Sequence, residues 1–119
     1  MSTVEPQYRF LLDLDESGKR QVFGLMSSGT WHQDPKRLGF LLSRYKFVSR
    51  MLNGLGNVVE IGCADAFGSR VVRQTVARLT VSDIDPVFIA DAEKIMDPDW
   101  PMSFVVHDLL TCPFPDRYD

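Results

Sequence analysis

Residues 57–86 read NVVEIGCADAFGSRVVRQTVARLTVSDIDP, and this stretch decides the fold. A short apolar run carries the acid Glu60 near its end, a loop of small residues follows, and a helix-length segment leads to a second apolar run that ends in Asp83. This order predicts a strand–helix–strand unit with a carboxylate at the end of each strand. Such a unit holds a nucleoside, because a loop of small residues lets the backbone approach the ligand and the second acid can accept both ribose hydroxyls.

The position of Glu60, two residues before the first glycine of the loop, separates two kinds of nucleotide-binding fold. In dinucleotide-binding units the loop cradles a pyrophosphate, and a carboxylate beside it would repel that anion. A ligand with a cationic end and no phosphate would instead be attracted by Glu60. S-adenosylmethionine is such a ligand, since it carries an ammonium and a sulfonium group.

At this point the sequence resembles the class I S-adenosylmethionine-dependent methyltransferases. Their first motif reads roughly acid-x-Gly-x-Gly-x-Gly, and it is matched here by Glu60, Gly62, Ala64 and Ala66. Their second signature is an acid that ends the second strand, which is Asp83 in this chain.

A third signature is an acid after the third strand, followed by a turn similar to Pro-Phe-Pro-Asp. It is present as Asp108 within the segment HDLLTCPFPD at residues 107–116. The resemblance therefore covers residues 57–119, and it says little about residues 1–33.

The resemblance implies a role for each candidate residue, and each has a structural alternative. Glu60 would bind the methionine ammonium directly or through water, or else be a solvated strand-end acid. Asp83 would accept the ribose hydroxyls or cap the next helix, although Asp85 is better placed for a cap. Asp108 would accept from the adenine amino group or be a plain loop acid. The predicted cofactor-binding residues are Glu60, Gly62, Cys63, Ala64, Asp83, Ile84, Asp108 and Leu109.

Three of these residues have narrower roles. The backbone N–H of Leu109 would donate to an adenine ring nitrogen, and Ile84 would lie against the adenine face or belong to the core. Cys63 is interpreted simply as a small residue of the loop. The sequence nominates no catalytic residue, because the groups that usually shape the acceptor pocket follow later in the family fold.

Two departures from the family motif are Ala64 and Ala66, which stand where glycine is usual. Alanine costs little if the backbone there keeps a negative φ, but it is unfavourable where φ must be positive. Gly62 and Gly68 remain for the tightest points of the loop.

The predicted fold class is α/β: a Rossmann-like parallel sheet with helices on both faces, truncated to about the first three strands. The family uses a seven-stranded sheet, whereas Asp119 falls where the fourth strand should begin. We therefore expect an N-terminal extension (1–33) before the N-terminal half of a methyltransferase domain (34–119). That half comprises a leading helix (34–53) and a cofactor-binding part (57–119).

The expected elements follow from the spacing of apolar residues and from the capping and turn residues at their ends. Asp34 and Pro35 form a strong helix start. The helix continues with an apolar face at helical spacing and stops at Asn53-Gly54; that face is Leu38, Leu41, Leu42, Tyr45, Val48 and Leu52. Strands are predicted near 57–61, 79–83 and 103–107, and helices near 67–78 and 86–96. In the extension we expect a strand at 8–14, a turn at 16–19, an extended run ending near Leu25 and a loop at 26–33.

Composition narrows the partners of the chain. With 119 residues, 45% hydrophobic and 24% charged, it has the make-up of one globular domain. A net charge of −3 gives no global field that favours nucleic acid. No apolar run reaches transmembrane length, and the N-terminus lacks the pattern of a signal peptide. We therefore expect a cytoplasmic protein with reduced cysteines and no membrane partner, and the isolated cysteines and histidines predict no metal site.

Three functional hypotheses remain open. The first is a methyltransferase, truncated or completed by another polypeptide, that acts on an unidentified small molecule or protein. The second is a non-catalytic remnant or binding module that keeps the fold. The third is the nucleotide-binding half of an NAD-dependent oxidoreductase. In each, the free edge of the first strand invites pairing with another chain, so self-association of the isolated chain is expected.

Overall fold

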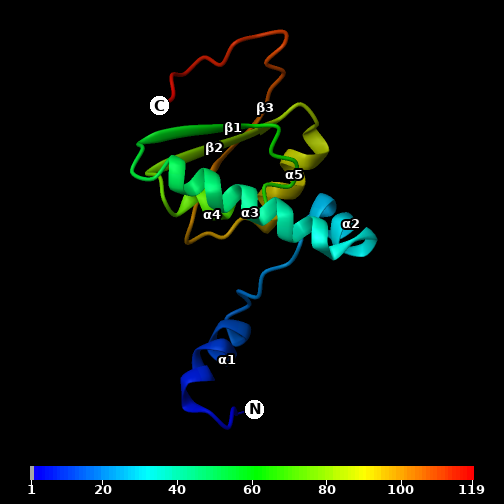
Figure 1. Ribbon diagram of the computed structural model, residues 1–119, viewed down its shortest axis with the longest axis vertical. Helices are drawn as coiled ribbons and strands as arrows, with labels where there is room; N and C mark the ends of the chain where they lie inside the picture. Colours follow the sequence, from blue (N-terminus) through cyan, green and yellow to red (C-terminus); the bar gives the residue numbers. More distant parts are fainter. Residues whose placement is uncertain (1) are drawn as a thin grey trace.

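The computed structural model describes residues 2–119 and contains one parallel sheet with helices packed around it (Figure 1). In chain order the elements are η1 (Pro6–Tyr8), α1 (Arg9–Glu16), α2 (Leu25–Gln33), α3 (Pro35–Met51), β1 (Asn57–Ile61), α4 (Ser69–Arg73), β2 (Arg78–Asp83), α5 (Pro86–Ile95) and β3 (Ser103–Val106). The strand order is β1-β2-β3, and both neighbouring pairs are parallel. The predicted fold class, a Rossmann-like sheet truncated to three strands, is confirmed.

Two helices begin at an Asp-Pro pair, as the sequence predicts. The Asp34 carboxylate accepts a hydrogen bond from the Lys36 N–H at 3.2 Å at the start of α3. The Asp85 carboxylate accepts from the Val87 N–H at 2.9 Å at the start of α5. In both cases proline occupies the first helical position, where no N–H is needed. Asp85, and not Asp83, is therefore the cap of α5.

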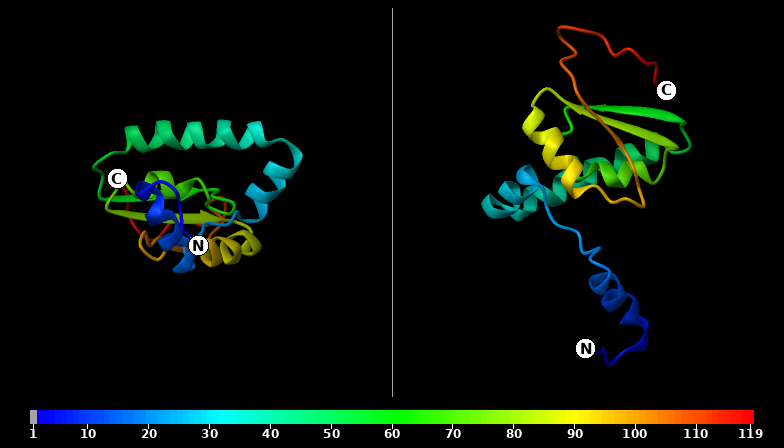
Figure 2. Two further views of the ribbon diagram at one scale, coloured as in Figure 1. Left: turned by 90° about the horizontal axis from the view of Figure 1, so that it is seen from below. Right: turned by 180° about the vertical axis from the view of Figure 1, so that it is seen from behind.

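The core lies between the sheet and the two crossover helices. Val58, Leu79 and Val81 are buried on one face of β1 and β2, and they pack in one cluster with Val72 of α4 and Ile89 of α5. Each new strand is added on the same side of the previous one, so right-handed crossovers place α4 and α5 against the same face. α3 packs on α4 as an outer layer, which is visible in the left view of Figure 2. The carboxyl ends of all three strands consequently meet at one edge of the sheet.

The prediction of a strand at residues 8–14 is wrong, because Arg9–Glu16 form α1. A strand here would need a neighbouring strand to satisfy its backbone groups, and α1 stands away from the sheet (Figure 1). The helix satisfies those groups internally and adds an ion pair between Arg9 and Asp13 at 3.2 Å, one turn apart. The turn predicted next is confirmed, with Gly18 in a left-handed conformation, whereas residues 19–24 form no strand.

The predicted loop at residues 26–33 is also wrong, because Leu25–Gln33 form α2. The first N–H groups of this helix are bound by carboxylates from distant parts of the chain. Leu25 N–H donates to Asp91 at 2.7 Å, and Ser27 N–H donates to Asp65 at 2.7 Å. These tertiary caps stabilise a segment whose local sequence has little helical pattern.

The helix predicted at 67–78 is shorter in the structure, where α4 spans only Ser69–Arg73. A turn follows in which the Thr75 hydroxyl and N–H both donate to the Val72 carbonyl, at 2.8 and 2.9 Å. The Arg73 guanidinium donates to the Val76 carbonyl at 2.9 Å and holds the turn closed. The side chains of threonine and arginine thus take over carbonyls that a longer helix would have used.

The C-terminal segment returns to the free edge of β1. The Asp119 N–H donates to the Asn57 carbonyl at 2.8 Å, and the Asp119 carboxylate accepts from the N–H groups of Gly56 and Asn57 at 3.0 and 2.8 Å. Asp119 therefore lies beside the start of β1, at the free edge of the sheet.

Two further features concern the whole described chain. Among residues 2–119, no helix is both long and apolar enough to cross a bilayer. Within the same residues, no group of three or more histidine, cysteine or acidic side chains is arranged to hold a metal ion.

Candidate functional site

The loop after β1 is built from three residues in the left-handed region of backbone space. Gly62, Ala64 and Ala66 have φ values of +79°, +49° and +57°. The N–H groups of Gly62 and Cys63 both donate to the Ser82 carbonyl at 2.9 Å, which closes the loop against β2. The two alanines thus have the positive φ that is unfavourable for a residue with a Cβ, at a cost of about 1–2 kcal/mol each.

The acid at the end of β2 stabilises this strained loop conformation. Asp83 accepts from the Ala64 N–H at 2.9 Å through Oδ2 and from the Asp85 N–H at 3.0 Å through Oδ1. The carboxylate is partly buried, so these bonds are stronger than they would be in open water. Asp83 therefore fixes the loop in the bent form and remains at the edge of the sheet where the strands end.

Glu60 lies on the helix side of β1 and has both oxygens engaged. The Ser69 hydroxyl donates to Oε1 at 2.6 Å, and the Tyr45 hydroxyl donates to Oε2 at 2.6 Å. Burial raises the pKa of the Glu60 carboxyl, and the two hydroxyl donors oppose that rise. Burial and the charge of Glu60 also raise the pKa of Tyr45, so its hydroxyl stays protonated and donating.

The two acids have different immediate contacts. Glu60 borders a cavity of about 520 Å³ between α3 and β1, which also reaches Gly62. Asp83 instead contacts the loop backbone. Burial raises the pKa of the Cys63 thiol to about 12, and the charges of Glu60 and Asp83 add to the rise. The thiol is thus buried and neutral.

The residues expected at the adenine lie at the open edge of the sheet. The His107 N–H donates to the Asp83 carbonyl at 3.0 Å, which brings the end of β3 beside the end of β2. Asp108 accepts from the Leu110 N–H at 3.0 Å and closes a turn. Ile84 is 64% exposed and Leu109 is 46% exposed, so Ile84 is not a core residue.

Sequence reasoning missed three residues that shape the site. Tyr45 was assigned to the apolar face of its helix, and Ser69 and Asp65 were not singled out. A signal for Tyr45 existed, because it carries the one hydroxyl on that apolar face and a buried tyrosine hydroxyl needs a partner. No comparable local signal marks Asp65, whose carboxylate both caps α2 and accepts from the Phe67 N–H at 3.1 Å.

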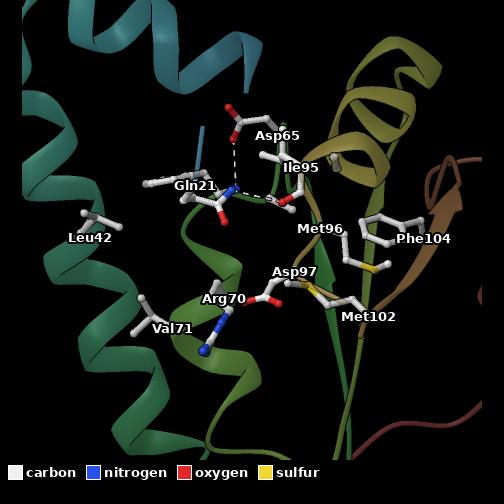
Figure 3. A pocket seen from close by; sticks show the side chains of 13 residues that line it. Gln21, Leu42, Asp65, Arg70, Val71, Ile95, Met96, Asp97, Met102 and Phe104 are labelled. Atoms are coloured by element: carbon white, nitrogen blue, oxygen red, sulfur yellow. Dashed lines mark hydrogen bonds between the residues drawn. The ribbon is translucent and has the colours of Figure 1, made fainter. Parts of the chain in front are cut away.

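A second cavity, of about 270 Å³, lies between α4, α5 and β3 (Figure 3). Its lining is mainly apolar, and Arg70 and Asp97 face each other across its lower part in Figure 3. The Arg70 guanidinium lies 4.2 Å from the centre of the Trp100 ring. Gln21 crosses the cavity and donates to the Ile95 carbonyl at 3.1 Å, so the N-terminal segment is attached to α5 here.

The buried carboxyl of Glu60 predicts a measurable pH dependence of stability. Its pKa is raised above the ordinary value of 4.5, so between these two values the native state binds more protons than the unfolded state. The free energy of unfolding should therefore fall as pH rises through this window. Glu60→Gln removes the titrating group. Across this window the free energy of unfolding of the variant should therefore rise relative to that of wild type, by about 1.4 kcal/mol for each unit that separates the native and unfolded pKa values of Glu60.

Urea denaturation at a series of pH values from below 4.5 to neutrality measures this difference. The exposed Glu93→Gln variant is the matched control, and its stability should follow wild type at every pH. Parallel curves for Glu60→Gln and wild type would contradict the burial of an ionisable carboxyl at this position.

The comparisons with known proteins concern structure alone. No protein-family model matches the sequence, and no curated protein matches it. The fold is similar to that of the N-methyltransferase NodS from Bradyrhizobium japonicum WM9, with a TM-score of 0.51 and 24% identity over 71% of this chain and 46% of NodS. For NodS in complex with S-adenosyl-L-homocysteine the TM-score is 0.52, with 24% identity over 74% and 45% of the two chains.

A further similar structure is magnesium protoporphyrin IX methyltransferase (ChlM) from Synechocystis PCC 6803 with bound S-adenosylmethionine. Its TM-score is 0.50, with 19% identity over 100% of this chain and 62% of ChlM. The chain thus spans about half the length of NodS and less than two thirds of ChlM. At these identities the similarity shows the fold: the chain adopts a three-stranded portion of the class I methyltransferase fold.

Proposed function

We propose that this chain is the cofactor-binding part of an S-adenosylmethionine-dependent methyltransferase. The observation that carries the proposal is the strained loop at 62–66, held by the Asp83 carboxylate at the carboxyl ends of β1 and β2. Ligands of open parallel sheets bind at this edge. Two of the similar structures contain S-adenosyl-L-homocysteine or S-adenosylmethionine, which supports the same class of ligand here.

Asp83 is the residue proposed to accept the ribose hydroxyls. Its oxygens accept from two backbone N–H groups, yet an ionised carboxylate has about four acceptor positions. Two positions therefore remain for a pair of hydroxyls. In this arrangement the Asp83 carboxylate accepts hydrogen bonds from both the loop backbone and the ligand.

Glu60 is proposed to attract the methionine ammonium, alongside Gly62, Cys63 and Ala64 of the loop. Because Tyr45 and Ser69 already donate to it, Glu60 meets the ammonium on a remaining acceptor position or through water. Asp108, Leu109 and Ile84 are proposed to contact the adenine from the turns after β3 and β2. Leu109 and Ile84 are exposed and Asp108 is half-buried, so all three are accessible to it.

The reaction asks little of these residues beyond binding. The methyl group of a sulfonium is already activated, so the protein mainly holds a nucleophile in line with the carbon–sulfur bond. We assign no catalytic base, and the proposed acceptor is a small molecule or a protein side chain. The acidic balance of the chain does not favour nucleic acid.

Calorimetry of the 119-residue chain with S-adenosyl-L-homocysteine and with NAD tests the proposal. We expect binding of S-adenosyl-L-homocysteine and none of NAD, because the acid at position 60 disfavours a pyrophosphate. Tighter binding of NAD would replace the proposal with the oxidoreductase alternative. Absence of binding by either ligand would favour a remnant that keeps the fold without its cofactor.

A further inference from the structure

Within the described residues 2–119, the N-terminal helix α1 has an apolar face that is exposed to solvent. Phe10, Leu11 and Leu14 share one side of the helix and are 62%, 46% and 43% exposed. Asp13 borders this face on one side and Asp15 on the other. Each forms an exposed ion pair within its own chain, Asp13 with Arg9 at 3.2 Å and Asp15 with Arg20 at 2.9 Å. Figures 1 and 2 show that α1 projects away from the sheet and the other helices. We call this surface the α1 face.

The outer side of α3 carries a second exposed apolar surface. Phe40, Phe47 and Met51 are 70%, 65% and 68% exposed, and their spacing places them in one line along the helix. Basic residues border this line on both sides: Lys36, Arg37, Arg44 and Arg50. The sequence of α3 contains no acidic residue. We call this surface the α3 stripe.

We propose that the α1 face of one copy of this chain packs on the α3 stripe of a second copy, and that the exchange is reciprocal. Burial of the two apolar surfaces is the main driving force of the contact. The exposed ion pairs of Asp13 and Asp15 are weak, so these acids can exchange Arg9 and Arg20 for the bases of α3, which adds charge complementarity. Reciprocity doubles the contact, because each copy contributes one helix and receives one.

The anchoring of residues 17–24 favours a second copy over the chain's own α3. Lys19 forms an ion pair with Asp99 at 3.0 Å, and Gln21 is bonded to the Ile95 carbonyl, so this segment is attached at the end of α5. Only residues 17 and 18 lie between these anchors and α1. They span at most about 7 Å when extended, too little for α1 to turn back over α3 while the anchors hold.

Sedimentation velocity at a series of protein concentrations tests the proposal. We expect the wild-type chain to form a dimer that weakens as salt concentration rises, because the bordering charges are exposed. Leu14→Asp and Phe47→Asp should each raise the dissociation constant at least 10-fold. Leu110→Asp introduces the same charge at a side chain that is 95% exposed and outside both surfaces, so it should leave the dimer unchanged.

A charge exchange identifies the two surfaces as partners. A chain with Asp13→Lys and Asp15→Lys should be monomeric alone, and so should a chain with Lys36→Glu, Arg37→Glu, Arg44→Glu and Arg50→Glu. An equal mixture should restore the dimer, because every α1 face then meets an α3 stripe of opposite charge. Circular dichroism of each variant verifies that its helices are retained.

Two results would overturn the proposal. One is a wild-type chain that remains monomeric at every concentration. The other is a dimer that survives both Leu14→Asp and Phe47→Asp, which would place the interface elsewhere, with the free edge of β1 as the next surface to examine.

Discussion

Asp83→Ala is expected to weaken the binding of S-adenosyl-L-homocysteine at least 100-fold, which corresponds to a loss of about 2.7 kcal/mol or more. The proposed ribose contact contributes two hydrogen bonds to an ionised acceptor, each worth about 1.5–3 kcal/mol. The substitution also removes the acceptor of the Ala64 N–H, so the loop loses the bond that holds its left-handed backbone. Both losses act on the same ligand, which is why the expected effect is large. Calorimetry on the two proteins measures it.

Two variants separate ribose binding from simple damage to the fold. Asp85→Ala removes a neighbouring carboxylate whose bond goes to the Val87 N–H at the start of α5, so it should cost about 1 kcal/mol of stability and little affinity. Asp83→Asn keeps one acceptor oxygen and should fall between wild type and alanine. An affinity that Asp83→Ala leaves unchanged would refute the ribose assignment, whatever happens to stability.

The parts of the fold that follow from local rules were predicted well from the sequence. The start of α3 at Asp34–Pro35 and of α5 at Asp85–Pro86 needs only the residues at the helix end, and both are found. The predicted strand at 57–61 coincides with β1, because its β-branched apolar residues Val58, Val59 and Ile61 favour a strand.

The parts that failed depend on distant residues. α2 is capped by Asp65 and Asp91, which lie 38 and 66 positions away from the N–H groups that they accept from. No local pattern at the start of α2 announces those carboxylates, so the segment was predicted as a loop. α1 was predicted as a strand because its apolar residues are too few to distinguish the 3.6-residue period of a helix from the two-residue period of a strand.

The candidate site was predicted in part. The residues at the ends of the strands were found, because parallel strands bring their carboxyl ends to one edge. The engagement of Glu60 by Tyr45 and Ser69 was not, because it needs α3 to cross over α4 at one particular place. That crossing depends on a glycine whose role appears only in three dimensions.

Gly68→Ala is expected to lower the free energy of unfolding by about 3 kcal/mol, a large share of the stability of a small domain. A Cβ at position 68 would overlap the ring of Tyr45 far inside van der Waals contact. The ring cannot simply rotate away, because it packs against the core cluster and its hydroxyl is bonded to Glu60. Moving it combines overpacking, at about 1–3 kcal/mol, with the loss of a donor to a buried carboxylate.

Chemical denaturation measures this loss, and Gly39→Ala is the matched control. Gly39 lies within α3 with open space where its Cβ would be, so alanine there should stabilise the chain by up to about 1 kcal/mol. Tyr45→Phe completes the argument: alone it removes the hydroxyl donor, but in the Gly68→Ala background that bond is already broken, so the second substitution should cost much less. Additive effects of the two substitutions, or a Gly68→Ala chain as stable as wild type, would mean that the glycine does not serve to seat Tyr45 over Glu60.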